Sequence, residues 1–438
     1  MNTRLLLLLI SGSLFFSSCR KYDTALPVQP DASESSSAIA AEWMEQFRVV
    51  VKTQNLNPPQ ASRIYAYAGI ALYEAVVPGI AGNKSLQGQI PLLKNLPSPQ
   101  AFGKMNYQVS VNEAMYRVAK NVFVNLSASN VQAIDGLYKK YNDELVKVVF
   151  NKEYYDSKDF GQMVAAAIVQ RAATDGFSET RGMSYNAPGR NINPGFWAPT
   201  NAVTTPLEPF WGKVKCFAMS KADECEEPMS VAFSNTAGSA FHNQAVEVYQ
   251  VSQNLTQAQK DIALWWADGS NTATPPGHWL AIANKLVLSK NMPLGKAAEM
   301  YALLNIGLAD AFISCWDSKF KYNLLRPQTY IRDYIAGGNN WSSFIGTPPF
   351  PEYPSGHSVS SGAAAEILTT IFGNIPFTDD TNTSMGLAPR SYTSFYQAAD
   401  EAAVSRLYGG IHFREANENG VKQGKTLGKV VFKNIKLR

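Results

Sequence analysis

Three short motifs in the last third of the chain bring together residue types that bind a compact oxyanion. The motifs are Trp316-x-x-Lys319-x6-Arg326-Pro327, Pro351-Glu-Tyr-Pro354-Ser355-Gly356-His357 and Ser405-Arg406-x5-His412. Arginine offers a planar fork of N–H donors, lysine offers a point charge, and a Ser-Gly pair at a helix start offers a hydroxyl and backbone N–H groups. Small and apolar residues from Val359 to Phe372 predict a helix after this pair, with its N-terminus towards the anion.

The two histidines of these motifs add proton transfer to anion binding. One imidazole can bond the central atom of the oxyanion through a ring nitrogen. The other can carry a proton to or from the group on the opposite side, because the ordinary pKa of histidine is about 6.5. The residues alone do not say whether His357 or His412 has which task.

The three motifs, complete and in this order, resemble the signatures of the superfamily that joins vanadium-dependent haloperoxidases to type 2 phosphatidic acid phosphatases and bacterial acid phosphatases. Two of the four histidines in the chain belong to them. The resemblance implies that His412 bonds vanadium, or is the nucleophile of a phosphatase, and that His357 is the acid–base group. It also implies a set of residues around the equatorial oxygens: Lys319, Arg326, Arg406, Ser355 and the Gly356 amide.

Two aromatic residues favour the haloperoxidases within this superfamily. Trp316 lies three residues before the lysine and Phe350 seven before His357; these positions resemble the halide side of a haloperoxidase pocket. Plain aromatic packing is an equal alternative for each of them. Trp197 and Trp279 are further candidates for the pocket wall.

Vanadate and phosphate have nearly the same shape, so the anion-binding residues allow two activities. In the first, which the resemblance favours, vanadate is the cofactor and acts as a Lewis acid, and hydrogen peroxide oxidises a halide, with iodide or bromide preferred. The alternative is a secreted acid phosphatase with a phosphohistidine intermediate. A lipoprotein that binds oxyanions or glycans without turnover is a weaker third possibility, because it would need no second histidine.

The N-terminus predicts export. Residues 1–19 combine a charged start, a short apolar run and small residues before Cys19, which resembles a bacterial lipoprotein box. Residues 20–37 are polar and predict a flexible tether, so the protein would face the periplasm or the cell surface and touch the membrane only through its lipid anchor. A plain cleaved signal is the alternative. Cys216 and Cys225 could pair in an oxidising compartment or remain free thiols.

Composition and periodicity predict a mainly α protein. The chain is 45% hydrophobic, and its formal net charge of +4 is too small to suggest nucleic-acid binding. We expect two packed helix bundles, residues 38–250 and 251–438, with the site in the C-terminal bundle. Helical periodicity or helix signals cover these segments: 39–54, 59–77, 102–123, 131–149, 160–174, 297–319, 391–408 and 413–432. Residues 374–389 read as a polar loop.

Several residues outside the motifs could support the site. The aromatic, Pro- and Gly-rich stretch from Tyr185 to Trp211 is either a lid or pocket rim, or a surface loop. His278, in Pro275-Pro276-Gly277-His278-Trp279, lies at an expected helix start near the pocket mouth, where capping or packing is more probable than catalysis. His242 fits an ordinary helix-face histidine.

Three acidic residues lie close to the motifs in sequence. Asp310 and Asp317 are on the helix that carries Lys319, and Glu352 precedes the Pro354-Ser355-Gly356-His357 turn. Each could orient an arginine of the pocket from behind. A solvent-facing or helix-capping carboxylate is an equal alternative for each.

Overall fold

Helices form most of the computed structural model, which describes residues 30–200 and 205–438. The α-helices are α1 (Ala38–Thr53), α2 (Pro58–Val76), α3 (Tyr107–Val122), α4 (Ala128–Leu145), α5 (Asn151–Ala173), α6 (Phe177–Arg181), α7 (Ala240–Gln253), α8 (Gln257–Trp265), α9 (Thr274–Ser289), α10 (Leu294–Tyr322), α11 (Pro327–Tyr334), α12 (Gly356–Phe372), α13 (Phe395–Tyr408) and α14 (Arg414–Asn434). Short 3-10 turns lie at η1 (Ala32–Glu34), η2 (Val77–Gly79), η3 (Pro99–Ala101), η4 (Trp211–Lys213) and η5 (Thr383–Met385). Strands β1 (Phe377–Asp379) and β2 (Arg390–Tyr392) pair in an antiparallel hairpin. The predicted mainly α class is confirmed.

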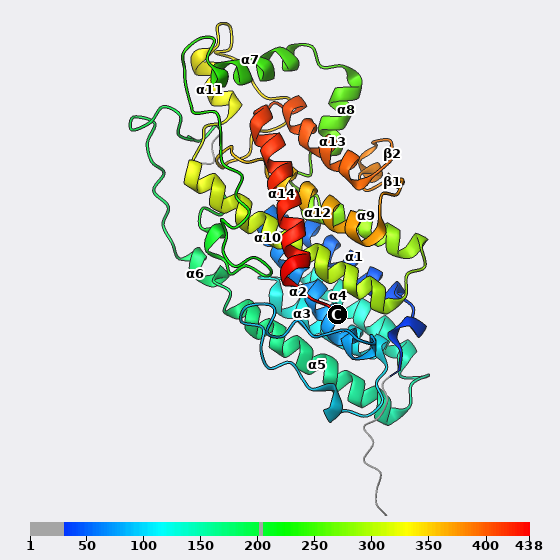
Figure 1. Ribbon diagram of the computed structural model, residues 1–438. Coiled ribbons are helices and arrows are strands. Elements are labelled where there is room, and N and C mark those ends of the chain that lie inside the picture. The colour runs from blue at the N-terminus through cyan, green and yellow to red at the C-terminus, as the bar shows by residue number, and fades with distance from the viewer. Residues whose placement is uncertain (1–29, 201–204) are drawn as a thin grey trace, which may run out of the picture.

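The helices pack as two bundles around the long helix α10 (Figure 1). In the N-terminal bundle α3 packs against α2 and α5, and in the C-terminal bundle α12 packs against α13 and α14. Helix α10 contacts α2 on one side and α12 on the other. Among the described residues, α10 alone is long and apolar enough to cross a membrane, but 94% of its most apolar window is buried, as in a core helix. The predicted pair of bundles is confirmed.

The helix starts follow signals in the sequence. Asn57 caps α2 by accepting a hydrogen bond from the Gln60 amide at 3.0 Å, and Pro58 and Pro59 occupy the first turn, where a missing N–H has no cost. Ser355 caps α12 in the same way through the Ser358 amide. Helix α12 therefore begins at Gly356, inside the second motif.

Helices α12 and α14 touch through a stripe of glycines on α14, Gly420, Gly424 and Gly428, which we call the glycine seam. A Cβ atom at Gly424 would lie 2.1 Å from the Val359 carbonyl oxygen, and one at Gly420 would lie 3.0 Å from the Ser355 carbonyl oxygen. A side chain at Gly424 would collide with the backbone of α12, and one at Gly428 would meet the Glu366 side chain. The four-residue spacing of these glycines therefore has a role in helix packing.

The N-terminal boundary of the folded body differs from the prediction. Residues 1–29, with the expected signal, Cys19 and most of the tether, lie outside the described residues, and these features stay predictions. Residues 30–37 are not free chain: Ala32 is fully buried, and the Ser35 carbonyl accepts a hydrogen bond from the Leu294 amide at 3.1 Å. The tether predicted to reach residue 37 is therefore wrong for this last part, because its small residues fit against α10.

Two further segments correct the predicted layout. Helix α7, expected in the N-terminal half, packs against α11 and α13 of the C-terminal half, with the Phe241 and Phe413 rings 5.0 Å apart between centroids. The segment 374–389, expected as a polar loop, contains β1. The Phe377 ring stacks on Phe395 of α13 at 5.0 Å, and this apolar contact holds the hairpin in place.

The cysteines of the described chain are free thiols. Cys216 and Cys225 are both buried and do not form a disulfide. The Cys216 carbonyl accepts a hydrogen bond from the buried Arg171 guanidinium at 3.0 Å. Of the two possibilities left open by the sequence, the structure has the unpaired form. Cys315 is fully buried on α10, next to Trp316 of the first motif.

Candidate active site

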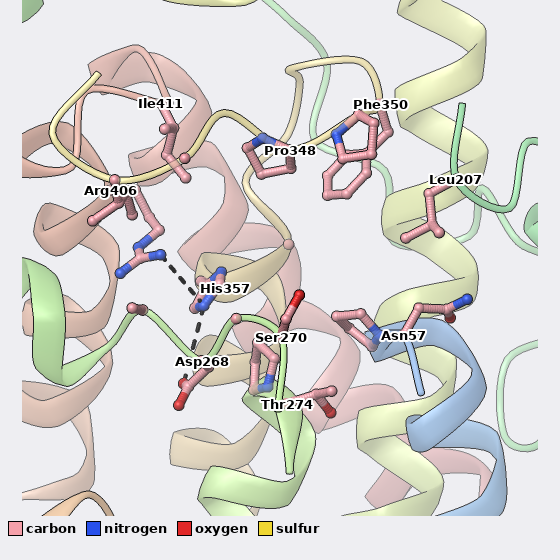
Figure 2. A pocket seen from close by; sticks show the side chains of 18 of the residues that line it. Asn57, Leu207, Asp268, Ser270, Thr274, Pro348, Phe350, His357, Arg406 and Ile411 are labelled. Atoms are coloured by element: carbon pink, nitrogen blue, oxygen red, sulfur yellow. Dashed lines mark hydrogen bonds and ion pairs between the residues drawn. The ribbon is translucent and has the colours of Figure 1, made fainter. Parts of the chain in front are cut away.

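The three motifs meet at one cavity of about 540 Å³ between the two bundles. Figure 2 shows its wall, with His357 between Arg406 and Asp268, and Pro348, Phe350 and Leu207 on the opposite side. The motif residues Trp316, Gly356, His357, Arg406 and His412 line the cavity, together with Phe350 just before the second motif. The N-terminal half contributes Asn57 and Leu207 to the rim. The sequence-based prediction that these motifs converge matches the geometry.

A sharp turn brings His412 back towards the helix that carries Arg406. Helix α13 ends at Tyr408, and Gly410 has a φ of +76°, a left-handed conformation that favours glycine. The Ile411 amide donates back to the Arg406 carbonyl at 3.2 Å. His412 thus follows the end of α13 by a few residues and precedes α14, and the Gly409-Gly410 pair is the local sequence signal for this break.

His412 is held at both ring nitrogens. Its Nδ1 lies 2.8 Å from Glu352 Oε1, and its Nε2 lies 3.2 Å from Arg326 Nη1. The same Glu352 oxygen accepts the Phe413 amide at 2.9 Å. Burial, together with the positive charges of Arg326 and Lys319, lowers the pKa of His412 well below its ordinary value, so the imidazole is neutral at pH 7.

Lys319 and Arg326 lie behind the cavity wall. The Lys319 ammonium donates to the carbonyls of Pro351 and Glu352 at 3.2 and 2.8 Å, and to that of Pro354. Arg326 donates to the Phe350 carbonyl at 2.8 Å and to the Ile411 carbonyl at 2.9 Å. Burial lowers the pKa of Lys319 to about 7 and that of Arg326 to about 10. These bonds tie the first motif to the loop of the second and to the turn before His412.

Glu352 is the buried carboxylate of this group. Desolvation raises its pKa to about 7, while Arg326 and Lys319 act in the opposite direction. The sequence allowed Glu352 to orient an arginine; the structure instead gives it a direct bond to His412. Asp310 accepts three backbone amides, from Phe217, Ala218 and Met219, and so fixes a loop of the protein. Among the described contacts, neither Asp310 nor Asp317 bonds an arginine of the pocket.

His357 has looser neighbours than His412. Its Nε2 lies 3.5 Å from Arg406 Nη1 and 4.0 Å from Asp268 Oδ2 (Figure 2). Burial and the charges of Arg406 and His278 lower the pKa of His357 well below 6.5. Arg406 also donates to the Ala263 carbonyl at 3.2 Å, which fixes its guanidinium beside the imidazole. Ser355, by contrast, does not appear among the described lining residues and serves as the cap of α12.

Behind Asp268 lies a buried triad that the sequence did not reveal. His278 bonds Asp268 Oδ1 through Nδ1 at 2.9 Å and Asp379 Oδ2 through Nε2 at 2.7 Å, and its ring stacks on Trp266. Burial alone would lower the pKa of His278, yet the two carboxylates raise it to about 10. His278 is therefore a buried cation that holds Asp268 beside His357. The sequence analysis placed His278 near the pocket mouth as a capping or packing residue, and nothing in the sequence paired it with Asp268 or Asp379.

The aromatic wall contains Trp316 and Phe350, with ring centroids 5.0 Å apart. The Trp316 indole donates to the Leu207 carbonyl at 3.1 Å, so the Tyr185–Trp211 stretch reaches the cavity at Leu207 and forms part of its rim. Trp197 and Trp279 are buried but are not among the described lining residues, which corrects their expected place in the wall. Each fills the interior beside its own segment instead.

Comparisons with known proteins agree with this site. A sequence model described as the VCPO second helical-bundle domain matches residues 299–437. The solved structure of a bacterial vanadium-dependent iodoperoxidase superposes with a TM-score of 0.84 at 35% identity, over 92% of this chain and 97% of that one. The chain belongs to the vanadium-dependent haloperoxidases. It is therefore an enzyme of this type, and the resemblance of its motifs is confirmed.

More distant relatives share the fold. A bacterial vanadium-dependent chloroperoxidase structure in its holo form has a TM-score of 0.68 at 17% identity, covering 94% of this chain and 96% of that one. The vanadium chloroperoxidase of Curvularia inaequalis is 28% identical in an alignment that spans 36% of this chain. That alignment spans 32% of the fungal enzyme, so this chain matches about a third of its length.

The donors of this haloperoxidase fit a vanadate ion. Three cations, Lys319, Arg326 and Arg406, are buried around the cavity. Arg326 Nη2 has no hydrogen-bond partner among the described residues, although it is buried. A buried donor without a partner costs about 1–3 kcal/mol, and more when it is charged, which an anionic oxygen would offset. The Gly356 and His357 end of α12 also reaches the cavity, where helix amides favour negative charge.

Proposed function

We propose that this enzyme oxidises iodide or bromide with hydrogen peroxide to hypohalous acid, with vanadate bound at the cavity. The observation that carries the proposal is the convergence of all three motifs on one cavity, with an unpartnered Arg326 donor beside His412. Similarity to an iodoperoxidase over nearly its whole length supports iodide as the first halide to test. The same similarity favours a haloperoxidase over an acid phosphatase, the alternative that the anion-binding residues allow.

The proposed roles follow from the geometry of the donors. His412 would bond vanadium through Nε2, the nitrogen that faces Arg326 rather than Glu352. The oxygens of vanadate would be held by residues that the motifs supply: Arg326, Arg406, Ser355 and the Gly356 amide. Lys319 would act from behind the cavity wall, because its three N–H donors bond backbone carbonyls. Bound vanadate supplies a Lewis acid that activates peroxide towards a halide and keeps its own oxidation state.

His357 would move the protons of the reaction. It lines the cavity, and its lowered pKa leaves it neutral and able to accept a proton from entering peroxide at pH 7. Asp268, 4.0 Å away, would stabilise the imidazolium that forms. Arg406 on the other side then favours return of the proton, because two positive charges in contact repel each other.

The halide would approach along the aromatic wall. Trp316 and Phe350 line the cavity, and the Lys319 ammonium lies 5.7 and 5.3 Å from their ring centroids. An apolar surface backed by a cation suits a large, weakly hydrated anion such as iodide. Such a surface binds a strongly hydrated anion poorly, because it does not offset the free-energy cost of removing the anion's water.

The test reconstitutes the purified protein with orthovanadate and measures peroxide-dependent oxidation of iodide and then bromide. Halide oxidation that needs vanadate and is inhibited by phosphate supports the proposal. The metal-free protein is tested in parallel on p-nitrophenyl phosphate. Ester hydrolysis that vanadate blocks, without any halide oxidation, would refute the proposed function.

A further inference from the structure

Glu352 lies where a single carboxylate oxygen controls the imidazole of His412. The side chain is fully buried, and its backbone amide donates to the Leu324 carbonyl at 2.9 Å, which fixes the residue. Oε1 lies 2.8 Å from His412 Nδ1 and 2.9 Å from the Phe413 amide nitrogen. Oε2 has no hydrogen-bond partner among the described residues. Both hydrogen bonds of Oε1 therefore go to the segment that carries His412.

Donor and acceptor chemistry at the two ring nitrogens selects one tautomer. Arginine has no acceptor atom, so the contact of 3.2 Å between Arg326 Nη1 and His412 Nε2 requires Nε2 to accept. A carboxylate oxygen accepts, so the contact at the other nitrogen requires Nδ1 to donate. Both neighbours thus demand a proton on Nδ1 and a lone pair on Nε2. The other tautomer would place donor against donor at Arg326, and a flipped ring would turn carbon atoms towards both neighbours.

We propose that Glu352 is a positioning residue for the cofactor. It holds His412 as the Nδ1–H tautomer, directs the Nε2 lone pair to the vanadate position and increases the basicity of that nitrogen. The inference rests on the proposed role of His412 as the vanadium ligand. It does not depend on which halide is oxidised, or on whether any halide is.

The experiment uses the full protein and two variants, Glu352→Gln and Glu352→Met. Glutamine can keep an acceptor oxygen at the Oε1 position, whereas methionine has a similar size but offers His412 no comparable acceptor. The matched controls are Glu113→Gln and Glu113→Met, because Glu113 is also buried and bonded, to Arg117 and to Tyr138, in the N-terminal bundle. Orthovanadate affinity is measured by calorimetry, and the His412 tautomer by ¹⁵N NMR of the imidazole nitrogens, assigned with His412→Ala.

We expect Glu352→Met to weaken vanadate binding roughly 10- to 100-fold, the usual effect of removing the partner of a metal-binding histidine. Glu352→Gln should keep the Nδ1–H tautomer and lose clearly less affinity. The Glu113 variants should bind vanadate as the unmodified protein does. This ordering separates orientation of the ring from a general effect of losing a buried carboxylate.

Two results would overturn the inference. One is a Glu352→Met protein that binds orthovanadate as tightly as the unmodified enzyme. The other is a spectrum of the unmodified enzyme in which His412 carries its proton on Nε2. This measurement does not depend on whether the methionine variant folds. A protein that binds vanadate in this manner yet oxidises no halide would refute the proposed function and leave the role of Glu352 intact.

Discussion

His412 and His357 face the same cavity, but the side chain of His412 is 3% exposed and that of His357 is 17% exposed. His412 is bonded at both ring nitrogens, to Glu352 at 2.8 Å and to Arg326 at 3.2 Å. The nearest carboxylate to His357 is Asp268, at 4.0 Å, and Asp268 is itself held from behind by His278. One imidazole bonds a carboxylate directly, whereas the other has a hydrogen bond with the backbone of Ala267 and its carboxylate neighbour lies farther away.

The difference matches two kinds of chemistry. A metal ligand must present one lone pair in one direction, so a tight bond at the other ring nitrogen, here the bond of Nδ1 to Glu352, is an advantage. A group that exchanges protons must alternate between two charge states, and a fixed donor at each nitrogen would oppose one of them. A loose contact with Asp268 leaves His357 free to take up and release a proton. Substitutions at the two positions should therefore have different consequences for binding and for turnover.

The largest effect is expected from His412→Ala. The variant should lose both vanadate binding and halide oxidation, because the proposed site has one protein ligand to the metal. Calorimetric titration with orthovanadate and an iodide oxidation assay check both losses. His242→Ala, on the surface-facing helix α7, is the matched control and should change neither. Full activity in His412→Ala would mean that this pocket has been assigned wrongly.

His357→Ala should separate turnover from binding. Loss of a general acid–base group costs roughly 10²- to 10⁴-fold in rate, so kcat for iodide oxidation should fall by this order. The dissociation constant for vanadate should change much less, because His412 and the cations remain. Steady-state kinetics at saturating vanadate give the first quantity and titration gives the second. Equal losses in both would contradict the division of tasks between the histidines.

Arg406→Lys should weaken vanadate binding while leaving a positive charge in place. Lysine cannot reproduce the planar fork of donors that spans His357 and the Ala263 carbonyl. A lost charge-assisted hydrogen bond of about 1.5–3 kcal/mol corresponds to roughly 10- to 100-fold in affinity. Arg414→Lys, on an exposed ion pair with Glu247, is the control. An unchanged affinity would remove Arg406 from the anion site.

The smallest effect on activity is expected at the triad behind His357, whose contribution appears as a pH dependence of stability. The pKa of His278 is raised from 6.5 to about 10 in the folded protein. The stabilisation is therefore complete below about pH 6.5 and is lost as the pH rises through about 10. Urea unfolding across this range should show a falling free energy of unfolding, and His278→Gln should flatten the decline. A decline of the same size in the variant would refute the charged triad.

The sequence predicted the site in the C-terminal bundle better than it predicted the support behind it. The three motifs carried residue types and spacings that resemble known signatures, and the Ser355 cap and the Gly409-Gly410 turn could be read locally. The Asp268–His278–Asp379 triad joins the loop after α8, helix α9 and strand β1. Tertiary packing decides which faces of these elements are in contact. Neither the periodicity nor the spacing of the sequence predicts this.

Short and exposed elements were the least predictable part of the fold. Helices α8 and α11 are 9 and 8 residues long and leave too few turns for a periodic pattern. Strand β1 has three residues and depends on the contact of Phe377 with Phe395. The hydrogen-bond partner of Glu352 could not be predicted from the sequence either. Two arginines and a histidine were equally suitable partners for this carboxylate until the backbone was placed.

The glycine seam between α12 and α14 has a consequence for how such an enzyme can change over evolution. His357 lies in the first turn of α12, and His412 lies two residues before α14. The two helices pack with their backbones in contact. The distance between the two imidazoles is therefore set by main-chain contacts and not by side chains that can be exchanged. Residues of the cavity wall and rim can be substituted to suit other halides or acceptors. One added methyl group in the glycine seam would instead move both histidines at once.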